Sequence, residues 1–288
     1  MNGQVRTMDR GNNKTFSLIR HDNIAYLQSP LFKASGLVEH AFSTRSGGCS
    51  SGNMASLNMA FHTEDSFDRV LENRRRFFEL FQADYRQIVS AIQVHGTTIA
   101  VFDNSHKGEG ALPHSAKKRY DALVTTEPDL ILTAYAADCQ LIYFCALDRP
   151  LIALAHAGKQ GALGRIGSQV VKYLEDQYQV KPGRLLVAMS PAVCRCCYQV
   201  GSEDADAFRQ AGWREQCYLE PTAGDKFNLD LGAINLSQLL TAGINNDNIA
   251  ISGLCTSCNP DLFYSYRRDC GKTGRMIGFI ALKNKGTG

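Results

Sequence analysis

The sequence predicts an α/β protein in which mixed β-sheets are flanked by helices. Three observations support this prediction: many apolar runs have the length of single strands, three segments show helical periodicity, and strands do not alternate regularly with helices. With 288 residues the chain can bury a sizeable core, and no repeat or Pro/Ser-rich linker divides it. We expect a single domain over residues 15–288, after a polar, Gly- and Asn-rich tail of residues 1–14 that we expect to be disordered.

The first expected elements lie between residues 67 and 154. A helix over residues 67–81 is predicted because its apolar side chains recur on one helical face. Residues 104–118 are rich in Gly, His and Lys and are expected to form a surface loop. Short runs of aliphatic and aromatic residues predict strands at residues 88–92, 97–102, 122–125, 130–136, 141–145 and 151–154.

The second half of the chain contributes two further helices and three strands. Apolar residues at helical spacing predict a helix over residues 163–174. Another helix over residues 232–241 is expected to end at Gly243, because glycine readily adopts the left-handed conformation that closes a helix. Apolar runs predict strands at residues 185–189, 249–254 and 276–282.

The composition is that of an ordinary globular protein and excludes several classes of partner. Apolar residues make up 44% and charged residues 20% of the chain, and the net charge is +3. This charge is too weak and too dispersed to favour nucleic acid, and no run of about 18 apolar residues predicts a membrane span. The N-terminus lacks the apolar centre of a signal peptide, so we expect a cytoplasmic protein whose ten cysteines are thiols or metal ligands.

Three residues at the edges of strand-like runs are candidates for one metal site: His95, Cys139 and His156. Two imidazoles and a thiolate suit Zn²⁺, and three protein ligands leave a fourth position open for catalysis. The gaps of 44 and 17 residues match no compact zinc motif, so ordinary packing residues are one alternative. The other is a cysteine hydrolase in which Cys139 is the nucleophile and His156 its base.

Two loop segments have the composition of ligand-binding loops. Residues 42–48 combine small hydroxyl side chains such as Ser43 with two glycines and Arg45, whose guanidinium can hold an anion bidentately. Residues 263–275 place Arg267 and two further arginines among aromatic residues, which suits phosphate binding or stacking on a base. The alternatives are a plain turn in the first segment and, in the second, a turn locked by an ion pair of Asp269.

Two further features concern metal chemistry. Asp138, next to Cys139, is a candidate general base or a group that orients a metal ligand. The cysteines of residues 194–197 could build a Cys₄ zinc site with Cys255-x-x-Cys258. Because consecutive side chains of one strand point in opposite directions, buried free thiols are the favoured alternative.

Taken together and in this order, the segments resemble the YfiH-like, laccase-domain family, also described as polyphenol oxidase-type or purine nucleoside phosphorylase proteins. The resemblance extends from about His40 to Leu282, nearly the whole chain. It is carried by residues 40–48 (HAFSTRSGG), 56–59 (SLNM), 73–74 (NR), 93–96 (QVHG), 121–125 (DALVT), 137–139 (ADC), 156–158 (HAG), 196–198 (CCY), 229–231 (LDL), 255–258 (CTSC) and 266–269 (YRRD).

The resemblance implies a fold and an activity. It implies mixed sheets in a YfiH-like α/β fold, a zinc ion on His95, Cys139 and His156, and phosphorolysis of the purine nucleosides adenosine, inosine and methylthioadenosine. It also implies adenosine deamination. Purine nucleosides and phosphate are then the expected partners, and residues 15–288 form one catalytic domain.

Site roles beyond the metal follow from the same resemblance together with the residue types. Arg45 is the first choice for binding phosphate or the nucleoside, with Ser43 and Arg267 as further substrate-binding candidates. Asp138 is the choice for proton handling or ligand orientation. After His-Ala-Gly the family usually continues Trp-Arg-Gly, whereas this chain has Lys159-Gln160-Gly161. Lys159 keeps a charge for substrate binding but lacks the planar fork of arginine.

Three alternatives remain open at this point. A copper-dependent polyphenol oxidase is disfavoured because the chain has seven histidines and no His-x-His pair, so Cu²⁺ is less favoured than Zn²⁺. A Cys139 hydrolase requires a thiolate that no metal holds. The third alternative, a non-catalytic binding protein, is favoured by the presence of Lys159-Gln160 where the family has Trp-Arg. The sequence leaves the preferred nucleoside and the oligomeric state open.

Overall fold

The computed structural model describes residues 15–116, 118–213 and 218–283, so the expected tail of residues 1–14 lies outside the described residues. The first six-stranded sheet has the order β1 (Ser17–His21), β2 (Ile24–Gln28), β3 (Val38–Ser43), β15 (Met276–Leu282), β7 (Ile131–Ala136), β4 (Ile88–Val89). The second has the order β14 (Ile249–Ile251), β10 (Leu185–Met189), β8 (Gln140–Ala146), β9 (Ile152–Ala157), β6 (Ala122–Thr125), β5 (Ile99–Val101). A small third sheet has the order β11 (Gln199–Gly201), β13 (Lys226–Leu229), β12 (Leu219–Pro221).

Strand pairing in the two large sheets is mixed. Most neighbours are antiparallel, whereas β4 with β7, β5 with β6 and β10 with β14 are parallel. The predicted α/β class with mixed sheets is therefore confirmed.

The described residues contain six α-helices, more than the three that periodicity predicted. They are α1 (Pro30–Ser35), α2 (Phe67–Glu79), α3 (Lys159–Leu163), α4 (Ile166–Tyr178), α5 (Ser202–Gln210) and α7 (Leu231–Thr241). Helices of five to nine residues, such as α1, α3 and α5, are too short to give a clear periodic pattern. No described helix is long and apolar enough to cross a membrane.

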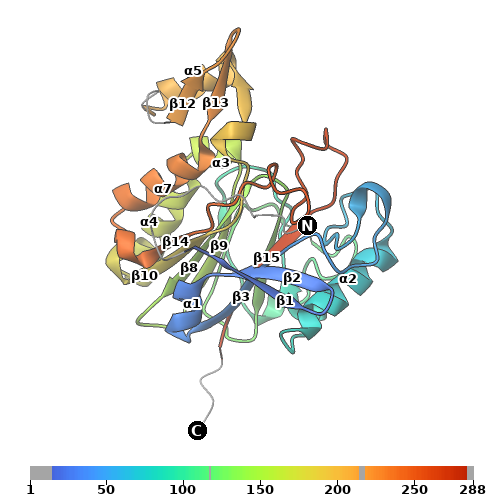
Figure 1. Cartoon of the computed structure of the whole chain (residues 1–288). Helices are drawn as coiled ribbons and strands as arrows, with labels where there is room; N and C mark the ends of the chain where they lie inside the picture. The colour runs from blue at the N-terminus through green and yellow to red at the C-terminus, as the bar shows by residue number, and fades with distance from the viewer. Residues whose placement is uncertain (1–14, 117, 214–217, 284–288) are drawn as a thin grey trace.

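The two large sheets pack face to face, and helices cover their outer faces (Figure 1). The helix α2 covers the first sheet, and α4 and α7 cover the second. Strands in the middle are buried on both sides: along β8, Leu141 and Tyr143 face the core between the sheets, while Ile142 and Phe144 face the helices. This double burial explains why continuous apolar runs, rather than alternating patterns, predicted these strands.

The two sheets approach each other closely at Gly278 in β15. A Cβ atom there would overlap the hydroxyl of Tyr143 and the side chain of Leu141, both from β8 in the other sheet. The Tyr143 hydroxyl donates to the carbonyl of Ala41 at 3.2 Å, which joins the two sheets at the same place. The absence of a side chain at Gly278 is therefore a condition for the observed spacing of the sheets.

The small sheet forms a separate cluster with α5 at the top of Figure 1. Its core contains Phe208, Trp213 and Leu229, and Leu231 and Ile234 of α7 join it to the rest of the protein. Sequence patterns predicted neither this cluster nor β1, β2 and β3, because strands of three to six residues with polar faces give weak signals. The expected loop of residues 42–48 begins only after Ser43, the last residue of β3.

Candidate metal centre and adjoining cavity

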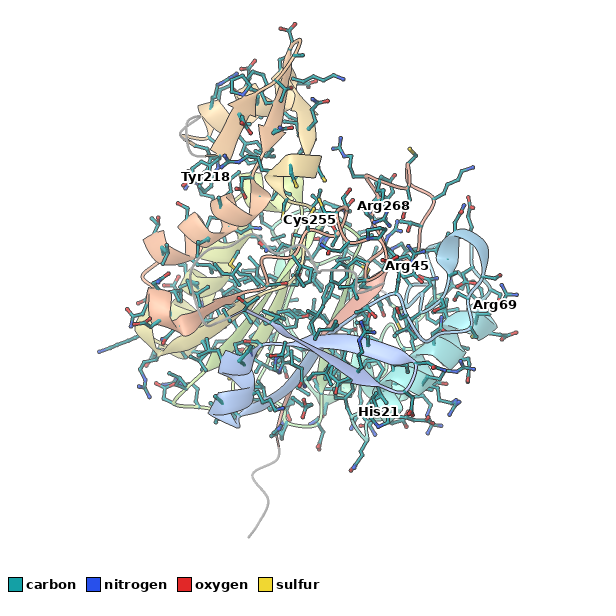
Figure 2. The ribbon with its side chains drawn as sticks, viewed as in Figure 1. His21, Arg45, Arg69, Tyr218, Cys255 and Arg268 are labelled. Carbon is teal, nitrogen blue, oxygen red and sulfur yellow. The ribbon has the colours of Figure 1, made fainter. Side chains whose placement is uncertain are left out.

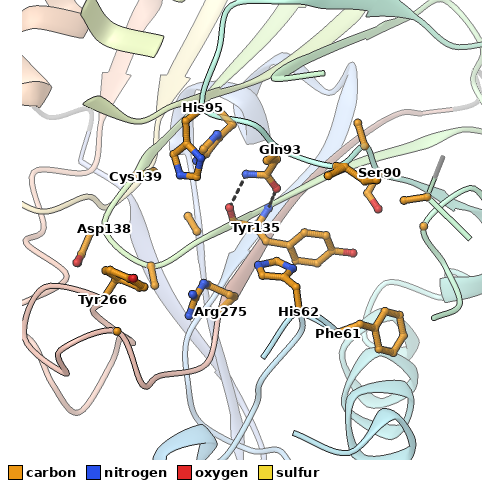
Figure 3. Close-up of a pocket in the computed structure, with 18 of the residues that line it drawn as sticks. Phe61, His62, Ser90, Gln93, His95, Tyr135, Asp138, Cys139, Tyr266 and Arg275 are labelled. Carbon is orange, nitrogen blue, oxygen red and sulfur yellow. Dashed lines mark hydrogen bonds between the residues drawn. The ribbon is translucent and has the colours of Figure 1, made fainter. Parts of the chain in front are cut away.

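A cavity of about 1300 Å³ lies at an edge shared by the two large sheets (Figure 3). Tyr135 near the end of β7 and Arg275 just before β15 contribute from the first sheet. Cys139 and His156 contribute from the second sheet. A cavity of this size accommodates a small organic ligand together with a second, smaller one.

His95, Cys139 and His156 meet at one end of this cavity. Cys139 directly precedes β8, His156 lies near the end of β9, and His95 lies in the loop that leads into β5. These strands share one region of the second sheet, and antiparallel pairing brings the start of β8 beside the end of β9. The potential donor atoms of the three residues all lie within 4.8 Å of one another. The sheet topology thus closes the long gaps in the sequence.

Two residues at this end of the cavity have backbone conformations that side chains rarely adopt. His95 has φ 63° and Asp138 has φ 96°. Asp138 and Cys139, together with Ala137, form the short connection by which the chain passes from β7 in one sheet to β8 in the other. Such conformations persist only where the surrounding structure enforces them, and they cluster at functional sites.

Gly158 leaves the space that the three side chains occupy. A Cβ atom at this position would lie 2.8 Å from Cys139 Sγ and 3.1 Å from His95 Cδ2. Real Cβ atoms do not approach sulfur this closely without a shift of the neighbour. The glycine that follows His-Ala in the sequence therefore serves close packing around the thiol.

Asp121 orients two of the candidate ligands, and sequence reasoning did not assign it to the site. Its carboxylate lies 2.9 Å from Nδ1 of His156 and accepts the backbone N–H groups of His95 at 2.9 Å and Gly96 at 2.7 Å. A proton shared through Nδ1 leaves Nε2 of His156 available for a metal. The Asp121 side chain is fully buried. The signal available in the sequence was an acidic residue directly before an apolar run that forms a strand.

Electrostatics favour the thiolate form of Cys139. Burial alone would raise the pKa of this thiol, but the imidazoles of His156 and His95 outweigh it and lower the pKa to about 6. Burial likewise opposes protonation of His156, but Cys139 and Asp121 raise its pKa to about 9. Burial alone would raise the pKa of Asp121 as well. Its hydrogen bonds, above all the one from His156, outweigh burial, so the pKa is lowered overall. A cation that displaced the His156 proton would find a thiolate and a carboxylate-oriented imidazole in place.

The donor set fits a tetrahedral N₂S metal site. Zinc bonds of 2.0–2.3 Å place neighbouring ligand atoms about 3.3–3.8 Å apart, and the donor atoms here all lie within 4.8 Å of one another. His95 is exposed and can approach by a small side-chain rotation. Cys139 as thiolate, the fixed tautomer of His156 and the space at Gly158 all suit such an ion.

Asp138 lines the cavity but its carboxylate is already engaged. Its Oδ1 accepts from the Thr256 hydroxyl and its Oδ2 from the backbone N–H of Arg267, both at 2.6 Å. Burial raises the pKa of this carboxyl, and these two hydrogen bonds only partly oppose the increase. Asp138 therefore both fixes the turn before Cys139 and holds a proton more readily than an exposed aspartate.

The structure does not bring Arg45 and Ser43 to the described lining of the cavity. The Arg45 guanidinium donates twice to the carbonyl of Ala55, at 3.0 and 2.8 Å, and once to that of Pro260 at 3.1 Å (Figure 2). The Ser43 hydroxyl accepts the backbone N–H of Ile277 at 3.0 Å inside the first sheet. Both side chains thus hold loops and strands together, a use that the sequence pattern did not distinguish from anion binding.

We expect Arg45→Ala to act on stability rather than on ligand binding. Loss of charge-assisted hydrogen bonds to Ala55 and Pro260, on a partly exposed side chain, should cost about 2 kcal/mol of unfolding free energy. Thermal and urea unfolding measure this loss. Metal content and affinity for phosphate should stay at the wild-type level. A variant with wild-type stability but reduced affinity for phosphate would instead show that Arg45 binds phosphate.

Lys159 and Arg267 do line the cavity. The ammonium of Lys159, in the first turn of α3, forms an ion pair with Asp204 of α5 at 2.6 Å. Arg267 is exposed, donates to the carbonyl of Gln199 at 2.8 Å and lies over the ring of Tyr198 at 4.8 Å. Both residues therefore connect the cavity wall to the small sheet and its helix.

The cavity also contains Arg275 and Tyr266 from the segment 263–275, which the sequence predicted as a ligand-binding loop, and His62, which the sequence did not assign to a site. Arg275 donates to two carbonyls of its own loop and lies 5.4 Å from the ring of Tyr266, which is 55% exposed. Burial lowers the pKa of Arg275, which marks a guanidinium with reduced hydration. Loss of hydration in the cavity and the charges of Arg275 and Arg74 hold the pKa of His62 at about 4. His62 gave no signal of its own in the sequence, since only the fold places it beside Arg275.

Comparisons with known proteins identify relatives over most of the chain. The family described as multi-copper polyphenol oxidoreductase laccase matches residues 39–283. The purine nucleoside phosphorylase YlmD of Geobacillus stearothermophilus is 38% identical over 252 residues, which cover 85% of this chain and 90% of that protein. A protein named adenosine deaminase RL5, from an unknown prokaryotic organism, is 31% identical over 246 residues, covering 84% and 94%.

Solved structures confirm the expected fold. The crystal structure of YlmD from Geobacillus stearothermophilus has a TM-score of 0.86 and 34% identity, and the match covers 94% of this chain and 100% of that one. The hypothetical protein YfiH of Bacillus licheniformis also has a TM-score of 0.86, with 32% identity over 93% and 99% of the two chains. The chain has the fold of these two proteins.

Proposed function

Because the chain belongs to the family described as multi-copper polyphenol oxidoreductase laccase, with relatives named purine nucleoside phosphorylase, we propose that it is a zinc-dependent purine nucleoside phosphorylase. The proposed substrates are adenosine, inosine and methylthioadenosine. The observation that carries the proposal is a His/Cys/His donor set at the end of a cavity that also contains a guanidinium and an exposed aromatic ring. A purine requires a stacking surface and phosphate requires a cation.

The proposed zinc ligands are His95, Cys139 and His156, oriented through Asp121. When bound there, zinc would supply a Lewis acid beside the substrate. A donor set of two imidazoles and one thiolate favours zinc over copper, because the coupled copper sites of oxidases require many imidazoles. A metal-bound thiolate is a poor nucleophile, which also disfavours the Cys139 hydrolase.

Phosphorolysis exchanges two bonds at the ribose. A phosphate oxygen bonds to C1′ while the bond from C1′ to the purine nitrogen breaks, and the purine leaves with the electron pair and takes up a proton. We assign phosphate binding to Arg275, because its guanidinium lines the cavity with reduced hydration. Asp138, whose pKa is raised by burial, is the proposed donor of the proton. Tyr266 offers a face for the purine, and Lys159 and Arg267 are proposed as further contacts at the cavity wall.

The proposal is tested by following each nucleoside with and without phosphate, using chromatography of the products. We expect phosphate-dependent release of the free base together with ribose 1-phosphate, or with 5-methylthioribose 1-phosphate when the substrate is methylthioadenosine. Elemental analysis of protein purified without added metal should find zinc. Copper as the bound metal would favour polyphenol oxidation, and turnover of no nucleoside by zinc-loaded protein would favour a binding protein.

Adenosine deamination is a second candidate, because one relative is named an adenosine deaminase. Deamination replaces the purine amino group by oxygen from water and does not consume phosphate. The same chromatographic assay separates the two reactions: inosine formed from adenosine without phosphate marks deamination, and adenine formed only with phosphate marks phosphorolysis.

We expect Arg275→Gln to raise the KM for phosphate roughly ten- to a hundredfold. The physical reason is the loss of a charge-assisted hydrogen bond, worth about 1.5–3 kcal/mol. Arg275→Lys, which keeps the charge but not the planar fork, should have an intermediate effect. Initial rates at varied phosphate and fixed inosine measure this change, and an unchanged KM in both variants would exclude Arg275 from the phosphate site.

A further inference from the structure

The search outside the cavity leads to a second cluster of potential ligands, formed by Cys196, Cys197, Cys255 and Cys258. The sulfur atoms of these four residues all lie within 4.8 Å of one another. They come from two segments far apart in the sequence, a short turn before β11 and a loop after β14. We propose that these four cysteines bind a second zinc ion, at a structural site distinct from the His/Cys/His centre.

The sulfur separations suit metal binding. Cys258 Sγ lies 3.5 Å from Cys196 Sγ and 3.3 Å from Cys197 Sγ, and the latter two lie 3.7 Å apart. Four sulfur atoms at 2.3 Å from a tetrahedral zinc lie about 3.8 Å from one another. The observed separations therefore need only small adjustments to reach the tetrahedral arrangement, and all four cysteines are free thiols.

The local backbone explains how neighbouring cysteines can point the same way. Cys196 and Cys197 lie in a 3₁₀ turn, Arg195–Cys197, and not in the strand that the sequence analysis assumed. In a strand their side chains would point in opposite directions, whereas a tight turn brings both sulfur atoms to one side. The physical objection to a Cys₄ site that the sequence raised is therefore removed.

Hydrogen bonds join the two segments and order the loop after β14, and one of them ends on a sulfur atom of the cluster. The Thr256 N–H donates to the carbonyl of Ala192 at 3.0 Å, and Asn259 Nδ2 donates to the carbonyl of Cys255 at 2.8 Å. The Cys194 N–H donates to Cys255 Sγ at 3.4 Å, a contact that stabilises a thiolate. Arg268 donates to the carbonyl of Thr256 at 3.1 Å (Figure 2).

The position of the cluster indicates what a metal there would do. Four protein ligands leave no open coordination position, which is the mark of a structural zinc. Tyr198, next to Cys197, lines the cavity and leads into the small sheet, while Thr256, next to Cys255, holds Asp138. A zinc ion would therefore join the small sheet to the loop that fixes one cavity wall.

The test counts metal ions in the full-length protein by elemental analysis and native mass spectrometry. We expect two zinc ions in the wild type, one in Cys139→Ala, one in the double variant Cys196→Ser/Cys258→Ser, and none in the combination. Cys49→Ser, which alters a thiol outside both clusters, is the matched control and should keep two. Cobalt substituted into Cys139→Ala should show thiolate charge-transfer absorption that Cys196→Ser/Cys258→Ser abolishes.

A folding defect is separated from ligand loss by Cys258→His, since imidazole replaces thiolate in Cys₃His sites. This variant should keep the second zinc. A wild type with one zinc that Cys139→Ala removes completely would overturn the proposal, and so would disulfides among these four cysteines in the purified protein. The nucleoside assay is independent of this count, so failure of either proposal leaves the other standing.

Discussion

Replacing Cys139 with alanine is expected to abolish nucleoside phosphorolysis and to remove the metal from the His/Cys/His centre while leaving the fold intact. The thiol is one of three converging donors, and its electrostatic environment favours the thiolate. Loss of an outer hydrogen-bonding partner of a metal ligand typically costs 10–100-fold in affinity, so loss of the ligand should exceed about 100-fold. Metal titration and steady-state kinetics measure both effects.

Cys49→Ser is the control for this variant, because Cys49 belongs to neither ligand cluster nor the described cavity lining. Its thiol contacts Asn73, and serine preserves a hydrogen bond there. Circular dichroism should show that Cys139→Ala is folded. If the variant retains the metal of this centre with wild-type affinity, the ligand assignment is wrong.

The second large effect is expected from Asp121→Asn, which preserves shape but removes the charge. The carboxylate accepts from His156 and from two backbone N–H groups, and an amide offers only one acceptor oxygen for these donors. We expect metal affinity to fall about 10–100-fold and phosphorolysis to fall with it at limiting zinc.

Excess zinc distinguishes orientation from direct participation. If Asp121 acts through the ligands, saturating zinc should restore most of the kcat of Asp121→Asn. A variant with full metal affinity would show that the hydrogen bond to His156 does not contribute to the centre. Asp204→Asn, which removes a charged partner of Lys159 elsewhere in the cavity wall, should not change zinc affinity and serves as the comparison.

The central strands that the sequence predicted are buried on two faces. β7, β8 and β9 are continuous apolar runs because one side of each strand faces the other large sheet and the opposite side faces the covering helices. The strands β11, β12 and β13 were not predicted because three or four residues with exposed positions carry too little pattern. Short helices such as α3 were not predicted because five residues are too few to show a helical period.

The site shows the same division between local and long-range information. His95, Cys139 and His156 carried a chemical signal in their own side chains, which made them candidates before their proximity was known. Asp121 became part of the site only through the pairing of β6 with β9. Arg45 and Arg275 are equivalent as residue types, and both guanidinium groups donate to loop carbonyls. Only the fold shows that Arg275 also borders the cavity, whereas Arg45 is not among the described lining residues.

The attachment of the cavity's two sides to different sheets has a consequence for how its selectivity can change. The candidate metal ligands belong to the second sheet, whereas Tyr135 and Arg275 belong to the first. The distance between the metal and the groups that would hold a substrate is therefore set by how the sheets stack, at positions such as Gly278 and Tyr143. Under the proposed function, substitutions in that interior would tune the distance from metal to phosphate, and hence the size of nucleoside accepted, without altering any residue that touches the nucleoside.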